Sequence, residues 1–156
     1  MSGSGERGAR VRVLPPLLFL VPFLLAWLVH RVRPWSLPEV PGLRPAGLVL
    51  LLLALALMGW AALTMARHRT TVVPWEPVSA LVTTGPFARS RNPIYLADVV
   101  AYLGGSLVLA SWWPLLLLPL AVVAARRLVI DREEAYLRER FGASYEAYVA
   151  RVRRWV

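Results

Sequence analysis

The sequence predicts an all-α protein that crosses a membrane with about four transmembrane helices. Apolar residues make up 58% of the 156-residue chain, and its mean hydropathy is +0.55. In a soluble domain about half of the residues are apolar. Here the apolar residues gather in long runs and the charges lie between them. The length predicts a single domain, residues 1–156.

Four apolar segments match or approach the roughly 17–25 residues that a helix needs to cross the hydrocarbon core. They are residues 13–29, 46–66, 94–110 and 112–130. Pro22 predicts a kink in the first. The fourth loses its apolar character after Ala125, so it is either a tilted span or one that continues out of the membrane as an amphipathic helix. Residues 111–114, Ser-Trp-Trp-Pro, indicate a tight hairpin between the third and fourth spans, with tryptophans at the membrane surface.

The chain begins with the basic-then-apolar order of a signal peptide. No small-residue cleavage site follows the apolar run, because residues 30–34 read His-Arg-Val-Arg-Pro. We therefore expect an uncleaved first span.

The placement of arginine predicts the orientation of the spans. All eighteen basic residues are arginine, and fifteen of them lie in residues 1–12, 67–93 and 126–156. These segments share one side of the membrane if both termini do, and an excess of arginine marks the cytosolic side. We therefore expect a multi-pass protein of a bacterial plasma membrane with both termini and the polar loop in the cytosol. The net charge of +9 then belongs to membrane-flanking segments and does not indicate nucleic-acid binding.

The rarity of sulfur and imidazole ligands excludes several kinds of site. The chain has no Cys, which excludes disulfides, thiolate nucleophiles and Cys-ligated metals. Only His30 and His68 carry imidazole, which excludes a His-rich metal site. We expect no metal.

The carboxyl-terminal tail predicts an amphipathic helix on the cytosolic side. Gly142 interrupts a helical pattern, and Tyr145, Tyr148, Val149 and Val152 then fall on one helical stripe. Arginines at positions 151, 153 and 154 flank this stripe. We expect this helix to lie on anionic lipid at the membrane surface.

The loop before the third span is the first candidate for chemistry. Gly85-Pro86 predicts a turn, and Arg89 and Arg91 follow. Asn92-Pro93 opens the third span with a good N-cap residue and a proline in the first turn. A helix N-terminus beside arginine can bind a carboxylate or phosphate. The alternative is an ordinary membrane loop with a turn, positive charge and a capped helix.

Acidic groups near the spans are further candidates. Residues 131–134, Asp-Arg-Glu-Glu, follow the fourth span, and adjacent carboxylates can bind an ammonium or sulfonium group. The alternative is a solvated helix face with a Glu134–Arg138 pair. Asp98 lies inside the third span, where an ionisable residue is a functional candidate, unless it reaches the cytosolic interface.

Two ordered signatures resemble those of a known family. Residues 81–87, Leu-Val-Thr-Thr-Gly-Pro-Phe, and 91–95, Arg-Asn-Pro-Ile-Tyr, are similar to L-V-T-S-G-P-Y…R-H/N-P-x-Y. Residues 133–152 are similar to E-E-x-x-L…F-G-x-x-Y-x-x-Y…V. The family is the isoprenylcysteine carboxyl methyltransferase-like group of membrane methyltransferases, which is related to the phospholipid N-methyltransferases. The resemblance covers residues 70–156.

The resemblance implies that S-adenosyl-L-methionine binds in a cytosol-facing pocket formed by the loop, the third span and the tail. Phe87 stands where a Tyr is usual, Asn92 stands where His is commonest, and Glu133 is the implied partner of the cofactor's amino group. The implied cofactor-binding residues are Ser79, Ala80, Leu81, Val82, Gly85, Phe87, Asn92, Pro93, Ile94, Tyr95 and Glu133. The implied catalytic residues are Arg91, Asn92, Glu133 and Glu134.

The acceptor site departs from the eukaryotic pattern. Those relatives carry an Arg four residues before the Glu that corresponds to Glu133, and this chain has Val129 there. The substrate-binding residues that we expect are Asp98, Arg126 and Arg127. The expected substrate is a lipophilic small molecule or lipid, methylated on oxygen or nitrogen.

The residue inventory agrees with methyl transfer. Displacement at a sulfonium needs alignment of donor and acceptor more than an acid or base, and a partly dehydrated pocket favours it. No G-x-G-x-x-G motif follows a strand, which excludes a soluble Rossmann-type methyltransferase.

Two other functions stay open. A sterol-type reductase relative would bind NADPH in place of the methyl donor. A non-catalytic membrane scaffold or accessory subunit would use its arginine-rich face to bind anionic lipid or a partner protein.

Overall fold

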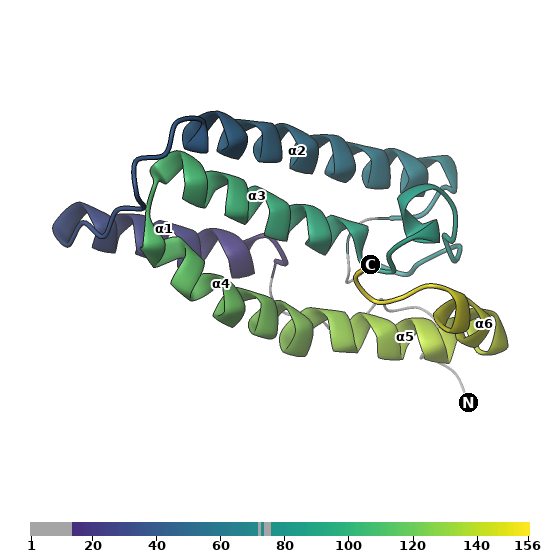
Figure 1. The fold of residues 1–156 in the computed structure, drawn as a ribbon. Helices are drawn as coiled ribbons and strands as arrows, with labels where there is room; N and C mark the ends of the chain where they lie inside the picture. Colours follow the sequence, from purple (N-terminus) through teal and green to yellow (C-terminus); the bar gives the residue numbers. More distant parts are fainter. Residues whose placement is uncertain (1–13, 72, 74–75) are drawn as a thin grey trace. The chain divides into compact units, whose positions relative to one another are not determined.

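The structure is a computed structural model that describes residues 14–71, 73 and 76–156. Its helices are α1 (Leu17–Val32), α2 (Leu43–Arg67), α3 (Pro93–Leu109), α4 (Trp112–Ala125), α5 (Asp131–Phe141) and α6 (Ala143–Arg151) (Figure 1). A short 3-10 helix, η1, spans Gly85–Ala88, and a π-helical segment, η2, spans Arg126–Ile130. The described residues form no strand, so the all-α prediction is confirmed.

Two of the helical stretches are long and apolar enough to cross a membrane. They are α2 and the uninterrupted stretch Trp112–Phe141. Helices α1 and α3 are apolar but shorter. Each predicted span thus corresponds to an apolar helix, while the number of crossings and their orientation stay predictions. The first predicted span begins at residue 13, and residues 1–13 lie outside the described part of the chain.

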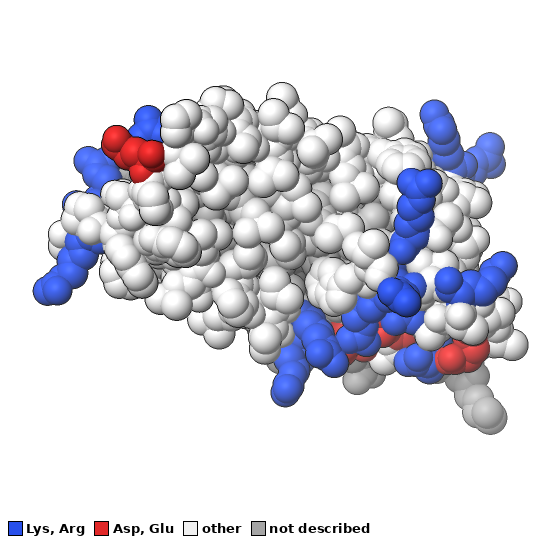
Figure 2. All heavy atoms as spheres, viewed as in Figure 1, with Lys and Arg blue, Asp and Glu red and all other residues white. Residues whose placement is uncertain are grey.

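The apolar helices expose large hydrophobic side chains along their middles. Leu52 and Leu55 of α2 are each 66% exposed, and Leu120 of α4 is 63% exposed. Figure 2 shows the uncharged stretches of this surface as white. Contiguous apolar surface of this kind is costly in water and favourable against lipid tails, which agrees with a membrane protein.

The described chain divides into two compact units. The apolar unit comprises residues 14–56 and 95–125, and the polar unit comprises residues 57–94 and 126–156. The single-domain prediction stays a prediction. We describe each unit by itself.

Small residues and aromatic rings hold the apolar unit together. Gly47 of α2 and Gly104 of α3 approach so closely that a Cβ on Gly104 would lie 2.8 Å from the Gly47 carbonyl oxygen. Close backbone contact at glycine is a common way for helices to pack in membranes. The rings of Phe19 and Phe23 on α1 meet the Tyr102 ring edge-on, with centroids 6.5 and 5.2 Å away.

The predicted tight hairpin forms at one end of the apolar unit. Helix α3 ends at Leu109 and α4 begins at Trp112. The Trp35 ring contacts the rings of Trp112 and Trp113 there. The backbone N–H of Trp112 donates to the Trp35 carbonyl over 3.0 Å, which ties the turn to the segment after α1.

The fourth predicted span continues as helix beyond its apolar part. After Ala125 the helix passes through the π-helical turn of η2 directly into α5. The helix thus continues beyond its apolar part, while the choice between a tilted span and a helix that leaves the membrane stays a prediction. π-Helical turns are rare and occur often beside functional sites.

The apolar stripe of the tail packs inside the polar unit. Tyr145, Tyr148 and Val152 are 1%, 3% and 9% exposed. They pack with partly buried side chains of the loop, α5 and α6, namely Leu81, Leu137, Phe141 and Val149. The expectation that this stripe lies on lipid was therefore wrong, because its hydrophobic partner is the protein's own loop and α5. Gly142, with φ +49°, makes the sharp turn that folds α6 back.

Candidate functional site

The loop before α3 is held against the end of α2 by a glycine turn. Gly85 has φ +60°, a conformation that L side chains rarely adopt. A Cβ at this position would lie 2.9 Å from the Thr64 hydroxyl oxygen. Pro86 is buried, and η1 follows directly. The Gly-Pro turn of the signature thus brings the next residues, 89–92, to a fixed place in the polar unit.

The carboxyl-terminal tail binds the residues that precede α3. The backbone N–H of Arg91 donates to the Arg153 carbonyl over 3.0 Å. The Asn92 side-chain Nδ2 donates to the Arg154 carbonyl over 3.1 Å, and the Ser90 hydroxyl donates to the same oxygen over 3.3 Å. Ser90 and Asn92 are 3% and 7% exposed, so these hydrogen bonds satisfy polar groups that are hidden from water.

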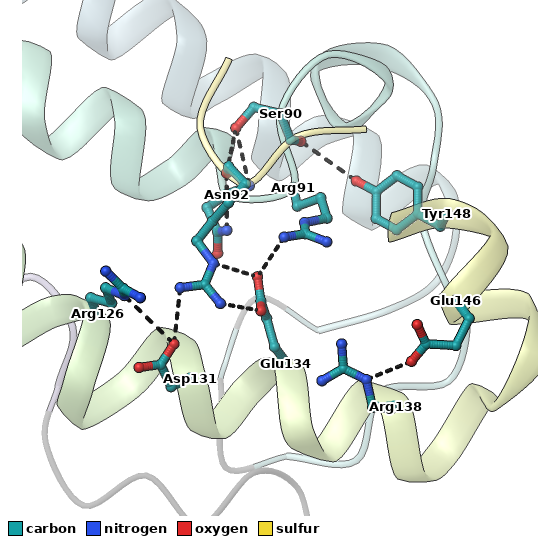
Figure 3. Close-up of polar contacts among 10 residues, drawn as sticks. Ser90, Arg91, Asn92, Arg126, Asp131, Glu134, Arg138, Glu146 and Tyr148 are labelled. Atoms are coloured by element: carbon teal, nitrogen blue, oxygen red, sulfur yellow. Dashed lines mark hydrogen bonds and ion pairs between the residues drawn. The ribbon is translucent and has the colours of Figure 1, made fainter. Parts of the chain in front are cut away.

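Glu134 of α5 is the centre of a charged cluster in the same place (Figure 3). It is only 6% exposed. Arg154 forms a two-pronged contact with it, Nε to Oε1 at 3.0 Å and Nη2 to Oε2 at 2.6 Å. The Arg91 Nη2 lies 3.3 Å from Oε1. Asp131, one helical turn earlier, lies 3.0 Å from the Arg154 Nη1. A buried carboxylate needs such partners, because burying an unpaired charge is very costly.

Arg154 pairs with both carboxylates of this cluster, Glu134 and Asp131. The hydrogen bond that Arg154 donates to Glu134 is the main cause that raises the pKa of Arg154, and burial opposes it. Glu134 pairs with Arg91 and Arg154, and Asp131 pairs with Arg126 and Arg154, so each carboxylate has two arginine partners. The hydrogen bonds of the cluster join ionised groups, which makes them stronger than neutral ones.

The Arg91 Nε is a buried donor of the cluster. It makes no hydrogen bond with any residue that the structure describes, while the Arg91 side chain is 11% exposed. Buried unpaired N–H groups are rare in folded proteins. This atom therefore marks a position where an anionic or carbonyl oxygen of a ligand would be favourable.

Tyrosines of α5 and α6 form hydrogen bonds with the backbone of the loop before α3. The Tyr148 hydroxyl donates to the Phe87 carbonyl over 2.7 Å, and the Tyr136 hydroxyl accepts from the Val78 N–H over 3.2 Å. Burial raises the pKa of Tyr145 to about 12, with the negative charge of Glu134 as a second cause. Both tyrosines of α6 are therefore neutral at physiological pH, since burial raises the pKa of Tyr148 as well.

The structure brings together part of the predicted catalytic set. Arg91, Asn92 and Glu134 meet in the cluster, and Glu133, half-buried, lies next to Glu134 on α5. The Glu134–Arg138 pair that a solvated helix face would need does not form, because Arg138 contacts Glu146.

The predicted cofactor-binding segment before the turn has mixed exposure. Ser79 is exposed, and its hydroxyl donates to the Arg69 carbonyl over 2.7 Å. Ala80 and Leu81 are half-buried and Val82 is buried. Pro93 is fully buried at the first turn of α3, and Ile94 after it is half-buried.

The predicted substrate-binding residues are more scattered. Arg126 and Arg127 are exposed, and the Arg126 Nε lies 4.0 Å from the Asp131 carboxylate. Asp98 and the predicted cofactor contact Tyr95 belong to the apolar unit. The Asp98 Oδ2 is buried and has no hydrogen-bond partner within the described part of the chain.

Two members of the site, Ser90 and Arg154, were not among the predicted candidates. Asp131 belonged to the candidate acidic segment 131–134, and it precedes Glu134 by three residues and so shares its helix face. Ser90 and Arg154 had no such signal, because their contacts with each other and with α5 join segments far apart in the sequence.

A comparison with protein families identifies the relatives of this chain. The family model described as Phospholipid methyltransferase matches residues 43–144. The chain belongs to the phospholipid methyltransferase family. The resemblance drawn from the two signatures is thereby confirmed at the level of this related group of membrane methyltransferases. No curated protein and no solved structure matches the chain significantly.

The matched region of this phospholipid methyltransferase family member runs from the start of α2 to the start of α6. It includes Arg91, Asn92, Asp131 and Glu134 of the cluster, whereas Arg154 lies beyond it. Membership of the family implies that the general reaction is methyl transfer.

Proposed function

We propose that the protein is an S-adenosylmethionine-dependent methyltransferase that acts in the membrane on a lipophilic small molecule or lipid. The observation that carries the proposal is the meeting of the two signatures. Arg91 and Asn92 come from the first and Glu134 from the second, and all three belong to one buried cluster. A chain that only anchored a partner would have no need for this arrangement.

The residues present fit the amino-acid part of the methyl donor. Its carboxylate suits the unpaired Arg91 Nε, because a guanidinium N–H and a carboxylate form a strong, charge-assisted hydrogen bond. Its ammonium group suits Glu133, the acidic residue next to Glu134. When bound, the cofactor supplies an electrophilic methyl group on a sulfonium centre.

The contribution of the protein is alignment rather than proton transfer. The Arg91–Glu134–Arg154 contacts fix the donors of the loop relative to α5. Fixed positions of this kind lower the entropic cost of bringing two reactants together. Burial of the cluster keeps water away from a reaction in which charge diminishes, which favours the transition state.

The acceptor would reach the site from the bilayer. Asp98 inside α3 offers a polar contact at membrane depth, and an ionisable residue there is a functional candidate. Arg126 and Arg127 stand exposed where the apolar part of the long helix ends. We propose Arg126 and Arg127 as contacts for the polar part of the acceptor, and Asp98 stays a candidate contact on the strength of the sequence.

Isothermal calorimetry in detergent tests the proposal. We expect saturable binding of S-adenosylmethionine, weakened by Glu133→Gln because the ammonium would lose its carboxylate partner. Glu139→Gln is the matched control, since Glu139 is an exposed acid on the same helix. Wild-type protein that binds NADPH but not the methyl donor would favour the reductase alternative. Protein that binds neither would favour the scaffold.

A further inference from the structure

Arg154, in the segment after α6, contacts both parts of the candidate site: the residues before α3 and helix α5. Arg154 lies after α6 and beyond residues 43–144, the region that the family model covers. Its side chain contacts α5, and its backbone contacts the residues that precede α3. The site in this chain therefore includes a residue outside the region that the family model matches.

The side chain of Arg154 pairs with two acidic residues of α5, Glu134 and Asp131. It contacts both oxygens of Glu134, at 3.0 and 2.6 Å, and one oxygen of Asp131, at 3.0 Å. A planar guanidinium can make this forked contact, whereas the compact ammonium of Lys cannot. The Arg154 side chain is itself only 25% exposed, so solvent screens the contact less than it screens a surface pair.

The backbone of Arg154 orients the amide of Asn92. Its carbonyl accepts from the Asn92 Nδ2 and from the Ser90 hydroxyl. The neighbouring Arg153 carbonyl accepts from the Arg91 N–H. The tail thus fixes the backbone of residues 90–92 at the same time as it fixes Glu134.

The consequence concerns Arg91. With Arg154 in place, the Arg91 Nη2 lies 3.3 Å from Glu134, and the Arg91 Nε has no hydrogen-bond partner among the described residues. Without Arg154, Glu134 would be a buried carboxylate with one partner at 3.3 Å. Arg91 would then be drawn fully onto Glu134, because an undercompensated buried charge is costly.

We infer that Arg154 is a positioning residue, which saturates Glu134 so that Arg91 keeps a free N–H for the carboxylate of the methyl donor. This inference rests on the proposed function for the identity of the ligand. The positional part, that Arg154 fixes residues 90–92, has its own readout.

The test compares Arg154→Gln, Arg154→Lys and the matched control Arg153→Gln in full-length protein in detergent. Arg153 is exposed and contributes only its carbonyl to the site, so its substitution removes the same charge from the same tail. Calorimetry gives the dissociation constant of S-adenosylmethionine, and amide hydrogen exchange reports on residues 90–92.

We expect Arg154→Gln to weaken binding by roughly tenfold or more, the size expected when hydrogen bonds to a charged group are lost. Arg154→Lys keeps the positive charge but cannot make the forked contact. We expect its affinity for S-adenosylmethionine to lie between those of Arg154→Gln and wild type. Exchange at residues 90–92 becomes faster in Arg154→Gln, and Arg153→Gln matches wild type in both measurements.

Three results would overturn the inference: wild-type binding by Arg154→Gln, an equal loss in Arg153→Gln, or unchanged exchange at residues 90–92. If Arg154→Gln does not fold, wild-type affinity and exchange in Arg154→Lys would overturn it equally. Wild-type protein that fails to bind the methyl donor refutes the proposed function, whereas the exchange measurement still decides whether Arg154 fixes residues 90–92.

Discussion

At the scale of single residues, Glu134 decides whether the candidate site holds together. It is buried, it belongs to the second signature, and it contacts arginines from two other parts of the chain. Its neighbour Glu133 is half-buried. Two adjacent acids in the sequence therefore have separate roles in our proposal: Glu134 supports the site and Glu133 binds the ligand.

We predict that Glu134→Ala lowers the free energy of unfolding by about 3 kcal/mol, the usual cost of removing one partner of a buried ion pair. Arg91 and Arg154 would keep their charges without a carboxylate between them. Thermal unfolding in detergent, followed by circular dichroism, measures the loss. Glu139→Ala on the exposed side of α5 serves as the control, and an equal loss in that variant would show that Glu134 has no special role.

A second residue-scale prediction concerns alkaline pH. The pKa of Tyr145 is raised from about 10 to about 12 in the folded protein because burial disfavours the phenolate. The folded state therefore holds this proton more tightly than the unfolded chain does. The corresponding stability is present below pH 10 and is lost as pH rises towards 12.

We therefore expect the free energy of unfolding to fall between pH 10 and 12, and to fall less steeply in Tyr145→Phe. Tyr148 contributes in the same direction, so some of the fall remains in this variant. Unfolding curves recorded across this pH range check the prediction. Identical slopes for the two proteins would contradict it.

At the scale of helices, the approach of α2 and α3 gives a prediction about packing. A Cβ on Gly104 would meet backbone atoms, the Gly47 oxygen at 2.8 Å and the Leu51 nitrogen at 3.0 Å. Backbone cannot move aside as the end of a side chain can. We predict that Gly104→Ala destabilises the protein by about 1–3 kcal/mol, the typical cost of overpacking.

Gly59→Ala on α2 is the matched control for this prediction. A Cβ there would meet nothing within 4 Å, and alanine favours a helix over glycine by about 1 kcal/mol. We expect this variant to be as stable as wild type or more so in thermal unfolding. If Gly104→Ala is equally stable, the close approach of the two helices is wrong.

The helices themselves could be predicted well from the sequence, because long apolar runs permit little else in a membrane. The predicted third span, residues 94–110, corresponds to α3 at Pro93–Leu109. The location of the apolar stripe on α6 was predicted wrongly. An apolar stripe indicates that a helix has a hydrophobic partner, but it does not indicate whether that partner is lipid or protein. Here the partner is protein, with Leu81 and Leu137 among the contacts.

In the candidate site, too, the residues with a local sequence signal could be predicted, whereas a residue placed by long-range contacts could not. Arg91, Asn92 and Glu134 carried local signals: a turn, a helix start and a pair of acids beside a span. Arg154 carried none, since its value depends on contacts with residues about 20 and 60 positions away in the sequence. Such contacts follow from the fold and not from the neighbouring sequence.

At the scale of the whole molecule, the arginine distribution predicts the topology. The chain has no Cys, so a single introduced Cys is a unique reporter. We expect Glu39→Cys to react with a membrane-impermeant maleimide on intact cells, and Ala88→Cys to react only after the membrane is opened. Both positions are exposed in the structure. The opposite labelling pattern would mean that the candidate site faces away from the cytosol.

The central claim is that the loop before α3 and the acids of α5 hold one ligand together. Amide hydrogen exchange with and without S-adenosylhomocysteine, the product form of the donor, tests it most directly. Our account predicts slower exchange in residues 85–94 and 131–138 at the same ligand concentration. Protection of only one of these segments, or of neither, would contradict it.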